Sequence, residues 1–329
     1  MDDEMNLIIN ERTDPAFNLA MEEYLLTGTN LDAVMLWRND KSVIIGKNQN
    51  ALEEIDIDYV KEHGIPVIRR QSGGGAVFHD LGNINFTILG AVHGGDFSNY
   101  EKFTAPIRDF LRGLGVNAEL RGRNDLVIGD MKFSGNAQAV KNGRIMHHGT
   151  ILYNADFGGL TGALKPNAAK IESKGIKSVR ARVTNVAAHL DSPMPAEEFF
   201  RRLCDYFLKN TKDIAEYTLT TADIEAANRL KDEKYSKWEH NFGKSPNYTY
   251  EKSVKLPSCL IDLRIYAAGG VIEDVKIFGD FFGELDINEL ENALKGVKHE
   301  QLEIEAVIRG FPLQKYIHGI TAEEFLSLF

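Results

Sequence analysis

The stretch Arg69-Arg70-Gln71-Ser72-Gly73-Gly74-Gly75-Ala76-Val77-Phe78-His79-Asp80 governs the interpretation of this sequence. It follows the apolar run 66–68 and precedes a second apolar run at 86–89. The pattern predicts a strand, a glycine loop, a short strand, a turn and a further strand. Three consecutive glycines weaken a strand, so they indicate a backbone with positive φ or one that another group approaches closely.

The glycines and the two arginines beside them predict an anion site, because free backbone N–H groups and a guanidinium together bind phosphate. A long hairpin with a flexible tip would explain the glycines equally well. The run lacks the Gly-Lys-Ser/Thr ending and the helix of a P-loop. It also lacks the helix of a dinucleotide fingerprint, since 76–78 reads as extended. A sheet and its loop are therefore expected to hold any nucleotide.

Composition limits the function classes that fit the chain. The 329 residues suit one large and one small domain. The formal net charge of -10 argues against nucleic-acid binding. No apolar run is long enough to span a membrane, and the acidic start 1–4 is unlike a secretory signal. Cys204 and Cys259 are far apart and are expected to be reduced thiols in a cytoplasmic protein.

Hydrophobic spacing and turn signals predict a mixed α+β sheet domain in the first part of the chain. A hairpin is expected from 33–37 and 42–46 around a polar turn, and a polar loop at 167–177. Two further hairpins are predicted at the turns Gly129-Asp130 and Asn142-Gly143. Helices are expected from Asp14-Pro15 onward and at 58–63, 100–114, 195–208 and 222–230.

A second, smaller α+β domain is predicted at the C-terminal end. Residues 242–247 read as a linker, which places the domains at 1–243 and 247–329. Alternating residues predict three strands at 248–254, 260–266 and 271–277, with Gly269-Gly270 turning the last pair. Helices near Leu290, Ile304 and Phe325 are expected to cover one face of these strands.

Lys132 is the first candidate for chemistry, because it interrupts the apolar strand 131–133. A solvent-facing lysine and a phosphate or carboxylate clamp both fit. Ser134-Gly135 directly after it and the polar patch 121–125 before it favour the clamp. Asp125 in that patch could approach a nucleotide-bound magnesium ion or cap a turn.

The remaining candidates are weaker. His147 and His148 are adjacent on a strand, so they point to opposite faces and are not expected to share a metal ion. No His or Cys pairs have zinc spacing. Cys204 lies on a predicted helix as an ordinary packed thiol, and neither cysteine belongs to the glycine or lysine patches.

Together these stretches resemble the lipoate–protein ligase family, which shares its fold with the biotin–protein ligases. The resemblance implies a mixed-sheet catalytic domain with a small α+β accessory domain, from the N-terminal helix to the C-terminus. The segments that carry it appear in family order: Trp37-Arg38-Asn39, 69–80, 82–86, Arg123-Asn124-Asp125-Leu126, 132–137 and 147–150.

The resemblance implies two half-reactions. Lipoate attacks the α-phosphate of ATP, supplied with Mg²⁺, to give lipoyl-adenylate and pyrophosphate, and a lysine of a lipoyl domain then takes the lipoyl group. The implied acceptors are acyltransferase subunits of 2-oxoacid dehydrogenases and the glycine cleavage H protein, and no permanently bound metal is implied. The implied nucleotide or adenylate residues are Arg70, Gly75, Ala76, Val77, Phe78, Asn83, Asp125 and Lys132. The implied lipoate residues are Lys132, Trp37, Arg70 and His79.

Two other functions remain open from the sequence. A lipoyl or octanoyl transferase of the same superfamily would use a cysteine thioester and no ATP. The lack of any cysteine before Cys204 and the presence of a C-terminal domain favour the ligase. A lipoate-binding protein without catalysis is the second alternative.

Overall fold

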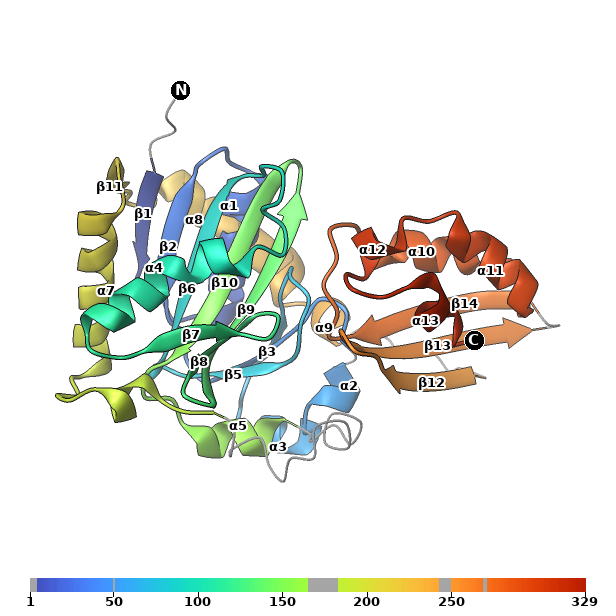
Figure 1. Cartoon of the computed structure of the whole chain (residues 1–329), viewed down its shortest axis with the longest axis horizontal. Coiled ribbons are helices and arrows are strands. Elements are labelled where there is room, and N and C mark those ends of the chain that lie inside the picture. The colour runs from blue at the N-terminus through green and yellow to red at the C-terminus, as the bar shows by residue number, and fades with distance from the viewer. Residues whose placement is uncertain (1–4, 50, 165–182, 243–249, 269–270) are drawn as a thin grey trace.

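The computed structural model describes residues 5–49, 51–164, 183–242, 250–268 and 271–329 as a large body that contains the N-terminus and a smaller body that contains the C-terminus (Figure 1). The predicted loop 167–177, nearly all of the predicted linker and the Gly269-Gly270 turn lie outside the described residues.

An eight-stranded mixed sheet forms the centre of the large body, in the order β11-β1-β2-β6-β10-β9-β8-β7. Parallel pairing joins β11, β1 and β2, and the remaining neighbours are antiparallel. The bounds are β1 Met5–Asn10, β2 Ala33–Trp37, β6 Asn83–Ala91, β7 Ala118–Arg121, β8 Asp125–Ile128, β9 Met131–Lys141, β10 Arg144–Leu152 and β11 Ile214–Glu216.

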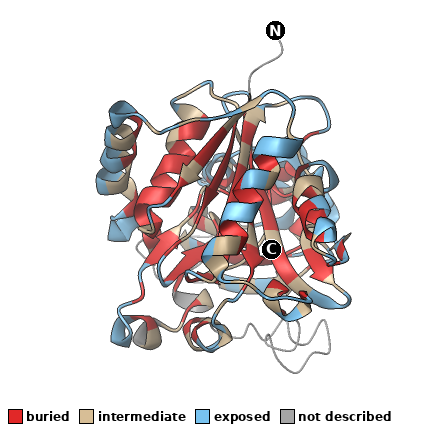
Figure 2. Ribbon diagram, turned by 90° about the vertical axis from the view of Figure 1, so that its left-hand side faces the viewer, coloured by how far each residue is buried: buried red, intermediate tan, exposed pale blue. Residues whose placement is uncertain are grey.

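Helices cover both faces of this sheet because successive strand residues point to opposite sides. Leu7 of β1 packs in a cluster with α4 (Tyr100–Gly113) and α7 (Ala196–Asn210), whereas Ile8 packs in another cluster with α1 (Pro15–Thr27) and α8 (Thr221–Leu230). Figure 2 shows the buried residues gathered on the strands and on the helix faces toward them. The mixed α+β fold is therefore confirmed.

Local signals placed several elements correctly. The Asp14 side chain accepts from the amides of Ala16 and Phe17 at the start of α1. Positive φ at Gly129 and at Asn142-Gly143 turns the two predicted hairpins, β8–β9 and β9–β10. The shorter helical elements are α2 Ala51–Glu54, α3 Ile57–Glu62, α5 Phe157–Ala163, η2 Val186–His189, η3 Lys231–Tyr235 and α9 Trp238–Asn241.

A second, three-stranded sheet corrects the predicted hairpin of 33–37 with 42–46. β3 (Ser42–Ile45) does not pair with β2; it pairs in parallel with β4 (Val67–Arg69) and antiparallel with β5 (Val77–His79). The segment between β2 and β3 is no free turn, because Asn39 is fully buried and accepts a hydrogen bond from Asn18 of α1. This anchor directs the chain into the second sheet.

The same sheet excludes a simple hairpin around the glycines. β4 and β5 lie on either side of β3, so the glycine loop, residues 70–76, passes over one end of β3. The predicted order of strand, loop, short strand, turn and strand is confirmed, but the two strands that flank the loop are not partners.

The smaller body is the predicted α+β unit. β12 (Tyr250–Lys255), β13 (Leu260–Ala268) and β14 (Val271–Gly279) form an antiparallel sheet. Leu290, Ile304 and Phe325 lie in one buried cluster with the inward residues of β13 and β14, as expected. The covering helices are α10 Ile287–Leu294, α11 Gln301–Arg309, α12 Leu313–Tyr316 and α13 Ala322–Leu326.

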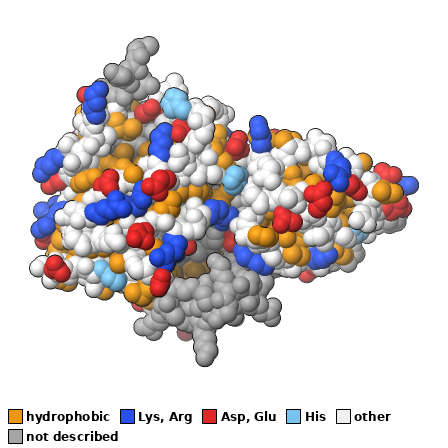
Figure 3. All heavy atoms as spheres, in the orientation of Figure 1, with side chains coloured by type: hydrophobic (Ala, Val, Ile, Leu, Met, Phe, Trp, Pro, Cys, Tyr) orange, Lys and Arg blue, Asp and Glu red, His pale blue; other side chains and the backbone are white. Residues whose placement is uncertain are grey.

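On the face drawn in Figure 3, positive and negative side chains are interspersed over both bodies. Among the described residues, none of the helices has the length and apolar character needed to cross a bilayer.

Candidate functional site

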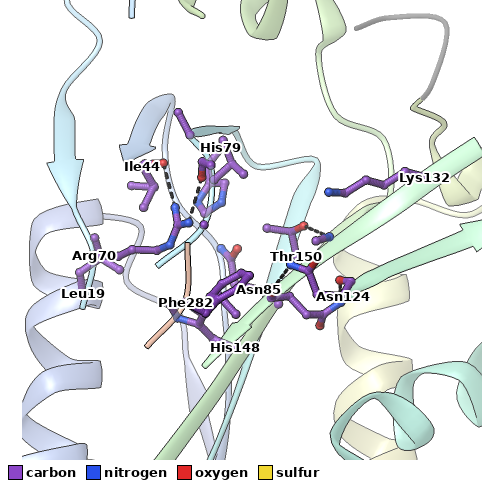
Figure 4. A pocket seen from close by; sticks show the side chains of 18 of the residues that line it. Leu19, Ile44, Arg70, His79, Asn85, Asn124, Lys132, His148, Thr150 and Phe282 are labelled. Carbon is purple, nitrogen blue, oxygen red and sulfur yellow. Dashed lines mark hydrogen bonds between the residues drawn. The ribbon is translucent and has the colours of Figure 1, made fainter. Parts of the chain in front are cut away.

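A pocket opens between the glycine loop, the strands β9 and β10, and a loop of the smaller body, with an empty volume of about 640 Å³ including its mouth (Figure 4). Its lining combines apolar side chains with several polar ones, as ligand pockets usually do. The lining residues are Leu19, Trp37, Ile44, Arg70, 74–77, His79, Asn85, Asn124, Lys132, 135–137, 148–150 and Phe282.

The glycines of the loop are explained by close approach of other backbone. A Cβ on Gly73 would lie 2.0 Å from the Phe281 carbonyl oxygen, and one on Gly46 would lie 2.0 Å from the Gly74 carbonyl oxygen. Gly74 itself has φ of +95°. Both reasons expected from the sequence thus apply, and at Gly73 the approaching group is the smaller body.

Arg70 is buried and holds the glycine loop from inside. Its guanidinium donates to the carbonyls of Ile44, Gly73 and Gly75 at 3.2, 2.7 and 2.9 Å, and Nε donates to Ser72 Oγ. Burial lowers the pKa of Arg70 to about 10. Arg69 points elsewhere and donates to carbonyls outside the pocket, including that of Gln49 at 2.6 Å. The two adjacent arginines therefore do not form one anion clamp.

Lys132 lies across the pocket from Arg70 (Figure 4). Its side chain is 37 % exposed, and its ammonium lies 2.6 Å from a carboxylate oxygen of Asp125, which is 41 % exposed. Ion pairs this exposed contribute little to stability. The ammonium can therefore exchange this carboxylate for a ligand oxygen at small cost. A Cβ on Gly135 would stand 3.0 Å from the Lys132 ammonium, so the glycine leaves it room.

The two adjacent histidines face opposite sides, as predicted. His147 stacks on Phe103 with ring centroids 5.0 Å apart. His148 lines the pocket, with Nδ1 2.9 Å from Glu22 Oε1 and Nε2 2.6 Å from Ser72 Oγ. Within the described ranges, no group of three or more potential metal ligands is present.

Most of the expected site residues meet at this pocket. Arg70, Gly75, Ala76, Val77, Trp37, His79 and Lys132 line it, and Asp125 contacts Lys132. The side chains of Phe78 and Asn83 do not line it. Phe78 is buried against α5, beside Gly159, and Asn83 lies behind Asn85, to which it donates a hydrogen bond at 2.9 Å.

Among the residues not expected from the sequence are Glu22, which contacts His148, and Phe282, which lines the pocket. Glu22 lies inside helix α1, which is almost fully buried. An acidic residue within such an apolar helix was the signal in the sequence that could have pointed to it. Phe282 reaches the pocket from the smaller body. Its ring lies against Gly74, and the guanidinium carbon of Arg123 lies 4.3 Å from the ring centroid. Only the fold places Phe282 beside the glycine loop.

Both cysteines are buried and form no disulfide, and neither lines the pocket. Burial raises the pKa of Cys204 to about 12 and that of Cys259 to about 11. Both thiols are therefore neutral near neutral pH and poor nucleophiles.

Comparison with known proteins fixes the family. The "Lipoyl protein ligase A/B catalytic domain" matches residues 14–208, and the "Bacterial lipoate protein ligase C-terminus" matches residues 245–329. The chain belongs to the lipoate–protein ligase family. It is 46% identical over 320 residues to lipoate-protein ligase LplJ of Bacillus subtilis, covering 96% of each chain. It is 44% identical to lipoate–protein ligase 1 of Staphylococcus aureus, covering 97% of this chain and 98% of the relative.

Solved structures of similar proteins have the same fold. LipL1 of P. falciparum in complex with lipoate superposes with a TM-score of 0.75 and 26% identity, covering 98% of this chain and 97% of that one. A lipoate-protein ligase A bound with ATP has a TM-score of 0.63 and 31% identity, covering 73% of this chain and 99% of that one. The resemblance found in the sequence is confirmed.

Proposed function

We propose that this protein is an ATP-dependent lipoate–protein ligase that works through lipoyl-adenylate. A lipoate carboxylate oxygen attacks the α-phosphorus of ATP, and the bond to the leaving pyrophosphate breaks. The acceptor lysine amine then attacks the lipoyl carbonyl carbon, the carbon–oxygen bond of the anhydride breaks, and AMP leaves. The observation that carries the proposal is the available ammonium of Lys132 facing the glycine loop across one pocket.

Lys132 acts as the mobile cation in this proposal. Adenylation concentrates negative charge on the α-phosphate oxygens, and a positioned cation stabilises that charge in the transition state. Its ammonium would contact both the phosphate and the lipoate carboxyl after leaving Asp125. Asp125 would then face the magnesium ion that accompanies ATP.

The glycine loop would hold the nucleotide. The Gly75 to Phe78 backbone would line it, so the inward-packed ring of Phe78 does not oppose this role. Arg70 would bind phosphate with the N–H that its four internal hydrogen bonds leave over. Asn83 would contribute indirectly, through the hydrogen bond that its side chain donates to Asn85.

Lipoate would occupy the apolar side of the pocket. Trp37 lies there as a wall, fixed by the hydrogen bond that its indole Nε1 donates to Thr87 Oγ1 at 2.9 Å. His79 lines the same side, with ring centroids 6.4 Å from Trp37. Lys132 and Arg70 would meet the carboxyl end.

The proposal extends to partners and setting. The acceptors would be lipoyl domains, including those of 2-oxoacid dehydrogenase acyltransferase subunits and the glycine cleavage H protein, and the reaction would take place in the cytoplasm. The catalytic domain would span 1–243 and the accessory domain 247–329, consistent with the two matched family regions.

Pyrophosphate release on mixing the protein with ATP and lipoate tests the proposal. A ligase releases pyrophosphate only when both substrates are present. A transferase acylates a cysteine without ATP, which the buried thiols disfavour. A lipoate carrier binds lipoate and releases nothing.

A further inference from the structure

His79 is a buried histidine that borders the pocket, and its two ring nitrogens have different surroundings. It is 3 % exposed, and its Nδ1 lies 3.1 Å from the Asn39 side-chain nitrogen. Within the described ranges, Nε2 of His79 has no hydrogen-bond partner. Buried polar atoms are satisfied by protein, water or ligand, and beside a pocket a ligand can supply the donor or acceptor. Which of these Nε2 needs depends on which ring nitrogen carries the proton.

A chain of three buried asparagines decides that question. The backbone N–H of Arg12 can only donate, and it donates to Asn10 Oδ1, so Asn10 Nδ2 must be the atom that donates to Asn18 Oδ1 at 2.8 Å. Asn18 Nδ2 then faces the backbone carbonyls of Arg12 and Arg38, which can only accept. The orientation of the Asn18 amide is thus fixed from both ends.

The orientation of the Asn18 amide determines that of the Asn39 amide. Asn18 Nδ2 lies 2.9 Å from Asn39 Oδ1 and shares its two hydrogens among this oxygen and the two backbone carbonyls. An amide nitrogen does not accept hydrogen bonds, so the reversed Asn39 amide would bring two nitrogens together with no bond between them. Asn39 Nδ2 is then the atom that faces His79 Nδ1 and donates to it. His79 Nδ1 must carry a lone pair. Burial and the positive charge of Arg70 lower the pKa of His79 to about 3, so the ring is neutral and its proton is on Nε2.

We propose that Asn39 and Asn18 are positioning residues that fix the Nε2–H tautomer of His79, and that this N–H donates to a carboxyl or carbonyl oxygen of the acyl substrate. The acyl substrate is favoured over the nucleotide because the His79 ring lies beside Trp37, an apolar side chain of the pocket lining. Asn85 borders the pocket as well, and its Nδ2 is buried without a partner among the described residues. The inference rests on the proposed function for the identity of the ligand.

The tautomer is tested first, without any turnover. Protein labelled with ¹⁵N-histidine is examined by two-bond ¹H–¹⁵N correlation near neutral pH, and the His79 signals are assigned from their loss in His79→Gln. If that variant does not fold, the assignment comes from selective ¹³C/¹⁵N labelling of wild-type protein. The expected result is a protonated Nε2 and an unprotonated Nδ1. A protonated Nδ1 would overturn the proposal.

Ligand additions distinguish the two possible acceptors. Lipoate alone is expected to shift the Nε2–H resonance, and a non-hydrolysable ATP analogue alone is expected to leave it in place. A shift with the nucleotide alone and none with lipoate would overturn the assignment to the acyl substrate.

Asn39→Asp reverses the chemistry at nearly constant shape, because a carboxylate facing His79 Nδ1 can only accept. If the spectrum shows that Nε2 has lost its proton, the lipoate KM should rise about tenfold, while the ATP KM changes less than twofold. If both nitrogens are protonated, the donor persists and the lipoate KM should stay within twofold. An unchanged lipoate KM without the Nε2 proton, or a large rise with it, would contradict the proposal. Asn210→Asp, which adds the same charge at an exposed helix end, is the matched control.

Failure of this inference and failure of the proposed function give different results. Absence of pyrophosphate release by wild-type protein with ATP and lipoate would reject the ligase function and leave the tautomer result standing. Pyrophosphate release together with a protonated Nδ1 on His79 would reject only the present inference.

Discussion

The two sides of the pocket hold their cations in opposite ways. Arg70, on the glycine-loop side, is buried and surrounded by acceptors of its own chain, among them the carbonyls of Gly73 and Gly75. Lys132, on the β9 side, is more than a third exposed and is paired with Asp125, which is equally accessible. Arg70 is therefore held by its own chain, whereas the Lys132 ammonium can exchange its partner.

This difference follows from the chemistry of the two side chains. A guanidinium has five N–H donors in a planar fork and can satisfy several carbonyls at once, which suits the inside of a tight loop. An ammonium on a flexible stem can leave one oxygen for another as charge develops on a substrate. The comparison predicts that removing Lys132 damages the reaction and that removing Arg70 damages the fold as well.

The largest effect is expected from Lys132→Ala. Loss of the cation at the reacting phosphate should lower the rate of adenylation on the order of a hundredfold or more. The melting temperature should stay close to that of wild type, since the lost ion pair is exposed. Pyrophosphate release and thermal unfolding are measured on the same preparation. A folded variant that releases pyrophosphate at nearly the wild-type rate would show that the Lys132 ammonium is not needed for adenylation.

Arg70→Met is expected to have the largest effect on stability. It removes the guanidinium hydrogen bonds to the buried carbonyls of Ile44, Gly73 and Gly75, which should lower the free energy of unfolding by roughly 3 kcal/mol. Urea unfolding measures this loss. Arg202→Met removes an exposed arginine paired with Glu198 and is the control, with an expected change below about 0.5 kcal/mol. Equal effects of the two substitutions would show that Arg70 does not build the loop.

A smaller effect is expected at the contact between the two bodies. Phe282→Ala removes the ring that the smaller body places over Gly74, so water should enter the adenylation site. We expect adenylation from ATP to slow about tenfold, while transfer from supplied lipoyl-adenylate changes less than threefold. A chain ending at Phe242 should show the same asymmetry more strongly. Phe278→Ala, elsewhere in the smaller body, is the control.

Two outcomes would change this interpretation of the smaller body. Equal loss of both half-reactions, with an unfolded circular-dichroism spectrum for the shortened chain, would mean that the smaller body only stabilises the larger one. Full activity of the shortened chain from ATP would show that the smaller body neither excludes water during adenylation nor stabilises the larger body.

The smallest effect is expected from replacing both cysteines. Cys204→Ala with Cys259→Ala should leave ligation within twofold of wild type, because both thiols are buried and neither lines the pocket. Lipoyl transfer to an acceptor domain is measured, with unfolding as the control for packing losses. A folded but inactive double variant, or a hydroxylamine-sensitive acyl-enzyme in wild type, would favour the transferase.

Much of the fold was accessible from the sequence because local signals determined it. Asp14 caps its helix, Asn142-Gly143 turns its hairpin, and the alternating strands of the smaller body pack under the expected helices. The hairpin predicted for 33–37 and 42–46 was wrong, because the tertiary anchor of Asn39 on Asn18 outweighed a local turn pattern.

The candidate site was accessible to the extent that its residues belong to continuous motifs. Arg70 and Lys132 were found from the glycine run and the interrupted strand, and the structure brings them to one pocket. Glu22 and Phe282 come from segments with no motif of their own. Their positions depend on long-range packing, which spacing along the chain does not report.

The fate of the lipoate oxygen tests the central claim, that the pocket activates lipoate as an adenylate, most directly. Lipoate labelled with ¹⁸O in both carboxyl oxygens is incubated with ATP, Mg²⁺, an acceptor lipoyl domain and the protein, and the products are analysed by mass spectrometry. We predict one ¹⁸O in AMP for each lipoyl group transferred and none in pyrophosphate. In Lys132→Ala, labelled AMP and lipoylated acceptor domain should decrease together. Lipoylation that proceeds without labelled AMP, or that places ¹⁸O in pyrophosphate, would contradict the claim.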